Sequence, residues 1–225
     1  MSALTVPGSA SGWSRRRVRQ VAGPVAVLLL VVVMALDTRF LTRDEVAALA
    51  PKPFDPAASS AELWNRARGE LPGTAVPLAQ VVQALQTDVK AAAASFKAAT
   101  PNQNAYAFPV TVEGVITEAG DSGARVQVDG VPAQTAVTVA AGPALNGSVV
   151  RDAMGFTFAQ APDQTRFQQV GDELRKLMTA ELQKAGTLAG KKVKVVGVMN
   201  VVAPTNTVPP AKPVVVQPIT VEVVS

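Results

Sequence analysis

The stretch whose residue types are most able to bind or react places a basic and an acidic side chain side by side. Arg151 and Asp152 stand in a glycine-flanked segment that begins at Gly147 and ends at Gly155-Phe156. In a strand the two charged side chains would point to opposite faces, whereas in a turn they would converge on one ligand. Two interpretations stay open. Either Asp152 caps a turn while Arg151 pairs with a carboxylate or carbonyl, or Arg151, Asp152, Gly155 and Phe156 contact a ligand or a protein partner.

The composition removes most catalytic chemistry. The chain contains no cysteine and no histidine, which excludes disulfides, thiolate metal sites, thiol nucleophiles and the commonest general base. Its serines stand outside any nucleophile-elbow sequence, and no histidine is present to activate them. A carboxylate pair for glycoside hydrolysis stays open, because nothing selects one pair among the ten acidic residues after residue 100. We expect a protein that is not an enzyme and has no catalytic residues, metal site or cofactor.

Alternating hydrophobic residues predict the strands that position these groups. The alternation begins at Tyr106 and is interrupted by a glycine, Gly114, as the fourth strand is by Gly197; such glycines mark bulges or the corners of small barrels. Outward positions carry polar side chains such as Thr111 and Glu113, Lys192 and Lys194, and Thr220 and Glu222. The four later strands are expected at Arg125–Asp129, Gln134–Ala140, Lys191–Val202 and Val214–Val224.

A helix is expected between the third and fourth strands. It opens at Pro162-Asp163, carries an apolar stripe from Phe167 to Leu182 and ends at Gly186. The order β-β-β-α-β-β predicts an α+β protein with an OB-fold-like five-stranded barrel, in which this helix closes one end. The alternative is an antiparallel sheet with helices on one face. Leu145–Gln160 is less regular, with a short strand expected at Gly155–Phe158 that turns both phenylalanines into the core.

Helical patterns predict a helical region before the strands, which we call the helical preface. Asp55 is a good N-cap and Pro56 suits the first helical position, with the helix expected to end before Pro72. Apolar residues then recur at helical spacing from Leu78 to Phe96, where Thr87-Asp88 can divide the segment into two helices. We expect these helices to pack on the strands.

The N-terminal region contains an uncharged apolar run, Gln20–Leu36. Its 17 residues reach the lower limit for a helix that crosses a bilayer, and Phe40-Leu41 can extend it. Four arginines, at positions 15, 16, 17 and 19, precede the run and predict a cytoplasmic N-terminus by the positive-inside rule. We expect a single-pass anchor in the cell membrane with the C-terminal bulk outside; a cleaved signal peptide and a buried core helix are the alternatives.

The charge distribution argues against nucleic acid. The net charge of +4 equals the four arginines of residues 1–20, and without them 17 basic residues balance 17 acidic ones. Asn102–Ser225 carries ten residues of each sign and few aromatic residues. The predicted OB-fold therefore has neither the basic groove nor the stacking surfaces that bind single strands.

Three segments resemble a known family. They are Phe54-Asp55-Pro56 with Trp64, then the Arg151-Asp152-Ala153-x-Gly155-Phe156 stretch with Gly147, then Gly190-Lys191-Lys192-x-Lys194-x-Val196-Gly197. Together they are similar to domain-of-unknown-function family 2291, bacterial predicted periplasmic lipoproteins without assigned activity. The resemblance covers Phe54–Ser225 and implies an anchored extracytoplasmic protein linked to sugar ABC-transporter operons. The family's lipidated cysteine is absent, and Gln20–Leu36 is expected to replace it as the anchor.

These features predict an organisation and a function. The segments are a cytoplasmic tail (1–19), the anchor (20–41), a linker (42–53), the helical preface (54–100) and the OB-fold-like domain (101–225). We expect a periplasmic or extracellular accessory or binding protein, with a solute-binding protein or a carboxylate-based hydrolase as alternatives. Its expected contacts with a partner are the barrel face and the loops Ala119–Gly123 and Ala203–Pro213. The expected partners are the membrane and a sugar ABC-transporter component.

Overall fold

The computed structural model describes residues 24, 27–34, 42, 53–203, 205–209 and 211–224. The chain divides into two units, Met1–Lys52 and Pro53–Ser225. In the first unit residues 27–34 are helical with exposed apolar side chains, and the rest of the predicted anchor Gln20–Leu36, apart from residue 24, lies outside the described residues. Among the residues described, no helix has both the length and the apolar character needed to cross a bilayer.

Five strands of the second unit pair in a closed ring. They are β3 (Ala105–Gly120), β4 (Gly123–Val128), β5 (Val137–Ala140), β6 (Lys192–Val202) and β7 (Val214–Val224). The order is β3-β4-β5-β7-β6, and β6 pairs again with β3. The β5–β7 pair is parallel and the others are antiparallel. Two short strands, β1 (Val76–Pro77) and β2 (Ala99–Asn102), add to β3.

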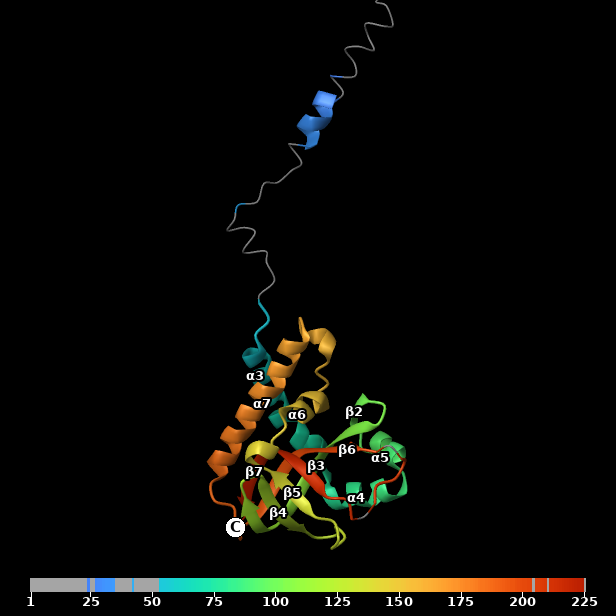
Figure 1. Cartoon of the computed structure of the whole chain (residues 1–225), viewed down its shortest axis with the longest axis vertical. Coiled ribbons are helices and arrows are strands. Elements are labelled where there is room, and N and C mark those ends of the chain that lie inside the picture. The colour runs from blue at the N-terminus through green and yellow to red at the C-terminus, as the bar shows by residue number, and fades with distance from the viewer. Residues whose placement is uncertain are drawn as a thin grey trace, which may run out of the picture. The chain divides into compact units, whose positions relative to one another are not determined.

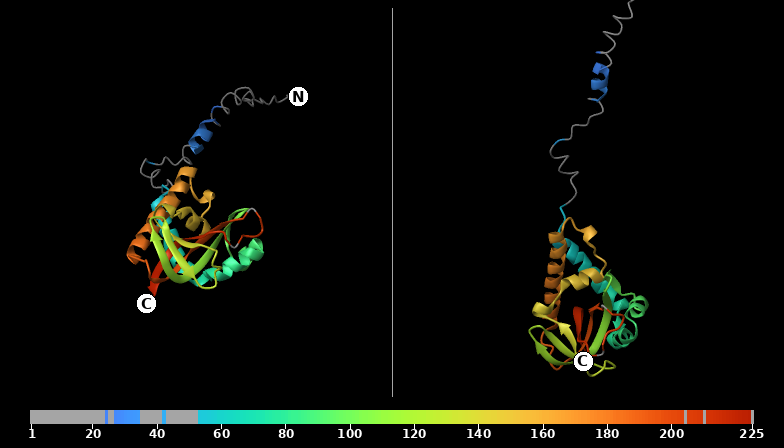
Figure 2. Two further views of the ribbon diagram at one scale, coloured as in Figure 1. Left: turned by 60° about the horizontal axis from the view of Figure 1, so that its bottom comes forward. Right: turned by 45° about the vertical axis from the view of Figure 1, so that its right-hand side comes forward.

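The strands of the ring curve strongly, as Figure 2 shows. Two glycines let neighbouring strands approach closely. A Cβ atom on Gly114 would lie 2.1 Å from the carbonyl oxygen of Gln127, and one on Gly197 would lie 2.4 Å from that of Gln217. The register between β6 and β7 also shifts at Gly197. The register shift confirms the expected irregularity at Gly197, whereas at Gly114 the structure shows a close approach to β4 without a shift of register at that residue.

The helices begin where the sequence indicates. Asp55 accepts the Ala57 N–H at 2.9 Å and Pro56 opens α3 (Pro56–Thr74). Asp88 separates α4 (Leu78–Thr87) from α5 (Val89–Ser95) by capping the second helix. The prediction that α3 ends before Pro72 is wrong. The helix continues for one more turn because Leu71 is buried and its carbonyl accepts the N–H of Ala75.

Two hydrophobic cores lie on opposite faces of the strands. The inner core joins α4 and α5 to inward residues such as Phe108, Val110 and Val195. The outer core joins α3, α6 (Gly147–Ala153) and α7 (Gln164–Ala185) to Val196, Val198 and other outward residues. Figure 1 shows α3, α6 and α7 together on one side and α4 and α5 on another.

This division corrects the predicted role of the helix Phe167–Leu182. Its buried residues Val170, Leu174 and Met178 belong to the outer core, so α7 does not close the interior of the ring. The inner core is filled by Leu78, Val81 and their neighbours instead. The sequence indicated an apolar stripe on each helix, but a stripe carries no information about which face of a sheet it covers.

Candidate functional site

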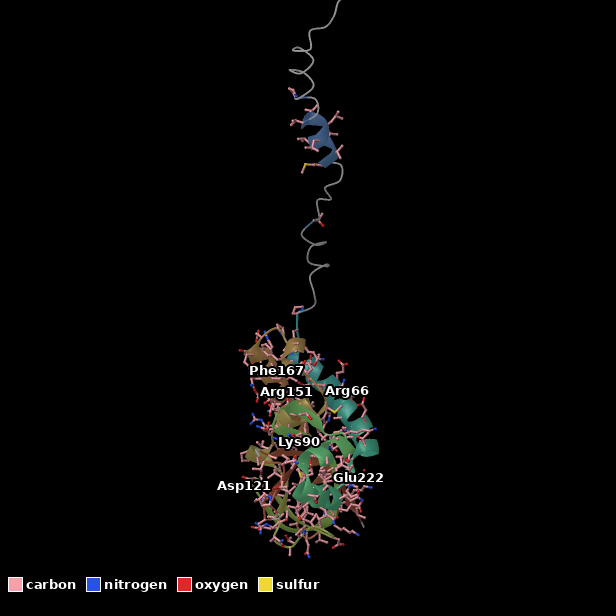
Figure 3. The ribbon with its side chains drawn as sticks, turned by 90° about the vertical axis from the view of Figure 1, so that its right-hand side faces the viewer. Arg66, Lys90, Asp121, Arg151, Phe167 and Glu222 are labelled. Atoms are coloured by element: carbon pink, nitrogen blue, oxygen red, sulfur yellow. The ribbon has the colours of Figure 1, made fainter. Side chains whose placement is uncertain are left out.

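Arg151 lies in α6, almost completely buried with 5 % of its surface exposed. Its Nε and Nη2 atoms contact Oδ1 of Asp152 at 3.0 and 2.9 Å, and Nη1 donates to the carbonyl of Phe167 at 3.1 Å. The guanidinium carbon also lies 3.6 Å from the centre of the Phe167 ring, a close cation–π contact. Every nitrogen of Arg151 therefore has a partner within the protein, and these partners join α6 to the first turns of α7 (Figure 3).

Gly155 and Phe156 end α6 in a Schellman motif. The Phe156 N–H donates to the carbonyl of Arg151 at 3.1 Å, and the Gly155 N–H donates to that of Asp152 at 3.1 Å. Gly155 has φ +71°, a left-handed conformation that favours glycine. The Arg-Asp-Ala-x-Gly-Phe spacing is thus that of a helix end and its cap. The expected strand at Gly155–Phe158 is wrong, since Phe158 begins a 3₁₀ turn, η2 (Phe158–Gln160).

Close contacts between α6 and α7 explain the remaining glycine of the motif. A Cβ atom on Gly147 would lie 2.0 Å from the carbonyl oxygen of Gly171, and one on Gly171 would lie 2.8 Å from Ser148 Oγ. Arg66 of α3 donates to the carbonyl of Met154, which joins the third helix to the same end of α6. The structure thus brings Arg151, Asp152, Gly155 and Phe156 together in a helix junction, and this geometry favours the first of the two interpretations of the stretch.

The two phenylalanines of this region have different environments. Phe156 is buried and stacks on Phe167, as expected for a core residue. Phe158 is 52 % exposed, so the expectation that both rings face the core is wrong for Phe158. The change of direction follows from the 3₁₀ turn, because the alternation of a strand no longer applies.

The predicted contact loops are small or attached to helices. Strands β3 and β4 extend to Gly120 and Gly123, so the first loop is reduced to Asp121-Ser122. In the second loop, the Asn206 carbonyl accepts the N–H of Val89, and the Val208 N–H donates to Leu85, both at 2.9 Å. This loop therefore covers the junction of α4 and α5.

A more open candidate lies on the outer face of β3, β6 and β7, which we call the sheet groove. The register of these strands places outward residues in three parallel rows. The rows are Thr111–Val196–Thr220, Glu113–Lys194–Glu222 and Val115–Lys192–Val224. The central row alternates negative, positive and negative charge across three strands, and neighbouring residues such as Val112, Val193 and Val195 point into the core.

Two adjoining clefts hollow the sheet groove, and both include Thr111. The first, of about 510 Å³, lies between this face and α3, where Asn65, Arg68, Gly69 and Pro72 form its wall. The second, of about 620 Å³, extends to the start of α4 and to Gln127 and Asp129 of the β4 end. Among the described residues that line the two clefts, hydroxyl, amide and charged groups are frequent and none is aromatic.

The charged groups of the sheet groove are paired loosely. Lys194 Nζ lies 3.4 Å from Glu113 Oε1, with both side chains about half exposed. Arg68 lies 3.9 Å from Glu181 across α3 and α7. An exposed pair such as Lys194–Glu113 contributes about 0–1 kcal/mol, so an incoming ligand can replace it at small cost. No group of three metal-ligating side chains was found in the part of the chain that the structure describes.

The sequence predicts that the residues of the sheet groove face outward, but it does not predict that they lie side by side. Thr111, Glu113, Lys194 and Glu222 each stand at predicted outward positions of separate strands. Which residue lies beside which depends on strand register, and nothing in the local sequence sets that register between strands about 80 residues apart in the chain. An outward polar residue on each of three predicted strands was the available signal.

Comparison with solved structures shows the class of fold. The second unit is similar to the crystal structure of an OB-fold protein from Thermotoga maritima, with a TM-score of 0.63 and 20 % sequence identity. The match covers 76 % of this chain and 99 % of that one. The closed order of the five strands agrees with this likeness, which shows that the domain has an OB-fold.

The sequence itself assigns the family. The family model described as predicted periplasmic lipoprotein (DUF2291) matches residues 26–222, so the chain belongs to this family. The resemblance carried by the Arg-Asp-Ala-x-Gly-Phe and glycine-lysine segments is thereby confirmed. A search of the curated proteins gave no significant match. The family description supports a location outside the cytoplasm in association with a membrane.

Proposed function

We propose that this chain is a membrane-anchored accessory protein that acts outside the cytoplasm without catalysis and binds a protein partner through the sheet groove. The observation that carries the proposal is the ladder of outward side chains on β3, β6 and β7. The interior of the strand ring is packed with side chains of the strands and of α4 and α5, so we place recognition on an outer surface. The sheet groove combines exposure, regular spacing and hydrogen-bonding groups.

The lining of the groove favours a protein partner over a free solute. Small-molecule sites are mostly apolar or aromatic, with a few polar groups that orient the ligand. The clefts beside Thr111 have many polar groups and lack aromatic lining among the described residues, which resembles the polar rim of a protein interface. The alternation of Glu113, Lys194 and Glu222 suits a partner strand or loop with complementary charges.

We propose that Gln20–Leu36 is the anchor. The run follows four arginines, and the sequence has no cysteine that could carry the lipid of a lipoprotein. The expected topology is a single pass with a cytoplasmic N-terminus. A reporter that is active outside the cytoplasm, fused after Ser225, should then be active. Neutral residues in place of the four arginines should weaken this orientation, and an unchanged topology would show that the charges do not set it.

The partner that we propose is a membrane component of a sugar ABC transporter, as the family resemblance suggests. The full chain should co-purify with such a permease after mild solubilisation of native membranes. Lys194→Glu should reduce this recovery strongly because it places a third negative charge in the central row. Lys176→Glu is the matched control, since Lys176 is also an exposed lysine beside a glutamate but lies on α7. Equal recovery of the two variants would contradict the proposal.

A solute-binding function is the second candidate, because clefts of about 510 and 620 Å³ are large enough for a sugar. Titration calorimetry of the full chain with sugars separates the two: heat that disappears in Thr111→Val would favour the solute. A hydrolase would use carboxylates such as Glu113 and Glu222. It would require turnover that Glu113→Gln or Glu222→Gln abolishes.

A further inference from the structure

Four phenylalanines form a continuous series of ring contacts at one end of α7. The ring centres of Phe54 and Phe156 lie 6.5 Å apart, Phe156 and Phe167 stack at 6.1 Å, and Phe158 meets Phe167 edge-on at 5.8 Å. We call these four residues the aromatic end. Phe158 is its outermost member and is 52 % exposed.

The exposed position of Phe158 is fixed by its local structure. Gln160 Oε1 accepts the backbone N–H of Thr157 at 2.7 Å, which forms part of a capping box around the turn η2. Phe158 makes an edge-on contact with the ring of Phe167, and the guanidinium group of Arg151 lies over that same ring. The structure thus holds a large apolar side chain at the surface beside the Phe167 ring, whereas Phe156 in the same segment is buried.

The aromatic end is also the end at which the chain enters the folded unit. Helices α3 and α7 are parallel, because Ser60 Oγ donates to the Val170 carbonyl near their beginnings and Arg68 meets Glu181 near their ends. Phe54 precedes the N-cap of α3, Asp55, and belongs to the ring series. Figure 3 shows Arg151 and Phe167 toward one end of this unit and Asp121 and Glu222 in its opposite half. A helix of 22 residues such as α7 spans about 33 Å.

The chain length before Phe54 limits the distance to the apolar run. Residues 37–52 join Leu36 to the folded unit and span at most about 55 Å when fully extended. A tether of this length keeps the domain at a high effective concentration near the bilayer, so a weak surface contact is enough to orient it. The tether alone would allow either end of the domain to reach the lipid.

The charges at the aromatic end do not form a basic patch. Asp55 and Asp163 cap α3 and α7, and Arg151 pairs with Asp152. Arg166 donates to the amide oxygen of Gln169. Attraction to anionic headgroups is therefore weak, and the apolar ring of Phe158 is the main group that a lipid surface can accommodate.

We propose that the aromatic end rests on the lipid surface, with Phe158 inserted at the boundary between headgroups and acyl chains. This contact rests on the proposed anchor and leaves the sheet groove, at the Glu222 end, free to meet a part of the proposed partner that projects from the bilayer. The contact is apolar, so it forms on zwitterionic lipid and is insensitive to salt. The exposed valines near the C-terminal end of β7, such as Val223, stay in water.

The absence of cysteine allows a clean test with the full chain in phosphatidylcholine vesicles that contain a quencher attached to the lipid. Ala159→Cys carries an environment-sensitive fluorophore beside Phe158, and Asp121→Cys carries it at the opposite end; both positions are exposed. We expect a blue shift and quenching of the label at position 159, at a depth of about 5–10 Å, and neither effect at position 121. Phe158→Ser should abolish both effects, Phe158→Trp should keep them, and Val223→Ser should leave them unchanged.

Flotation of the vesicles separates the two levels of the proposal. A chain that does not float with them lacks the anchor, and the lipid contact of the aromatic end is then overturned with it. A chain that floats while labels at 159 and 121 behave alike keeps the anchor and overturns the contact. Quenching that requires anionic lipid and disappears in salt, or that persists in Phe158→Ser, also contradicts insertion of Phe158.

Discussion

The helix junction around Arg151 and the sheet groove around Lys194 both contain charged side chains in family-like segments. They differ in how far these side chains are exposed and in how fully they are paired. Arg151 is 5 % exposed and has partners on all its nitrogens, whereas Lys194 is about half exposed and meets Glu113 at 3.4 Å. A buried, fully paired arginine mainly maintains the fold. An exposed charge with a weak partner is available to a ligand.

The difference shows why the most specific sequence motif is a poor guide to function here. The Arg-Asp-Ala-x-Gly-Phe stretch encodes a helix, its left-handed cap at Gly155 and its attachment to Phe167. These demands are local and strict, so they leave a recognisable pattern. The groove requires only alternate polar residues on three strands, a pattern that many solvent-facing strands share.

The largest effect is expected in the outer core. Leu174→Ala removes a side chain with no exposed surface from the contact of α7 with the sheet and should lower the free energy of unfolding by about 2–5 kcal/mol. Leu177→Ala, at a partly buried position of the same helix, is the control and should cost less. Urea denaturation measures both, and a loss below about 0.5 kcal/mol for Leu174→Ala would mean that α7 is not a core element.

The next largest loss of stability is expected from removal of the buried guanidinium group of Arg151. Arg151→Met leaves the Asp152 carboxylate and the Phe167 carbonyl without their donor, and we expect a loss of about 2–4 kcal/mol. Arg175→Met, which removes an exposed arginine paired at 3.9 Å, should change stability by at most about 0.5 kcal/mol. If Arg151→Met were neutral for stability but removed partner binding, the roles of the two regions would be reversed.

A methyl group added at Gly147 tests the close contact between α6 and α7. Gly147→Ala should destabilise by about 1–3 kcal/mol, because its Cβ would lie 2.0 Å from the Gly171 carbonyl oxygen. Gly69→Ala provides a control of opposite sign. Gly69 lies inside α3 with open space around it, so alanine should stabilise the domain by about 0.5–1 kcal/mol. Thermal unfolding measures both variants. If their melting temperatures shifted in the same direction, the result would contradict the close packing.

The sheet groove should tolerate change. Lys194→Glu is expected to alter the free energy of unfolding by less than about 1 kcal/mol, since like charges across exposed strands repel only weakly in water. The same variant should lose the membrane partner. A large loss of stability, measured by urea denaturation, would show that the central row maintains the fold and is not free to bind.

The smallest expected effect depends on pH. The pKa of Asp88 lies below its ordinary value of 3.8, chiefly because its carboxylate accepts the backbone N–H of Ala91 at the start of α5. A carboxyl whose pKa falls on folding contributes stability above about pH 3.8, and the contribution is lost as the pH falls through the folded value. Urea midpoints measured from about pH 5 to pH 2 should therefore change less in Asp88→Asn than in the natural chain. Equal pH profiles would show that folding does not lower the pKa of Asp88.

The extent to which the sequence predicted the structure follows from the range of the interactions involved. Strands β3 to β7, the cap Asp55, the division into two helices at Thr87-Asp88, and the glycines at 114 and 197 were predicted, because alternation, capping and interrupting glycines are visible in short segments. The OB-fold followed from their order. Helix α6 was missed because seven residues with a glycine and two β-branched valines give a weak helical pattern.

The candidate site depended on contacts that no local pattern specifies. Both charged residues of the Arg151-Asp152 pair were identified, but the choice between a ligand contact and a structural pair required the position of Phe167, 16 residues away. The face covered by α7 and the alignment of Glu113, Lys194 and Glu222 likewise depend on tertiary packing and strand register.

Site-directed cross-linking in native membranes tests most directly whether the sheet groove is the surface that binds a partner. Single cysteines are introduced into the cysteine-free full chain as Glu222→Cys in the groove and Lys176→Cys on the exposed face of α7, and each carries a short photo-cross-linker. If the sheet groove binds the partner, position 222 should give a discrete protein adduct that Lys194→Glu removes, and position 176 should give none. An adduct from position 176 alone, or none from position 222, would contradict it.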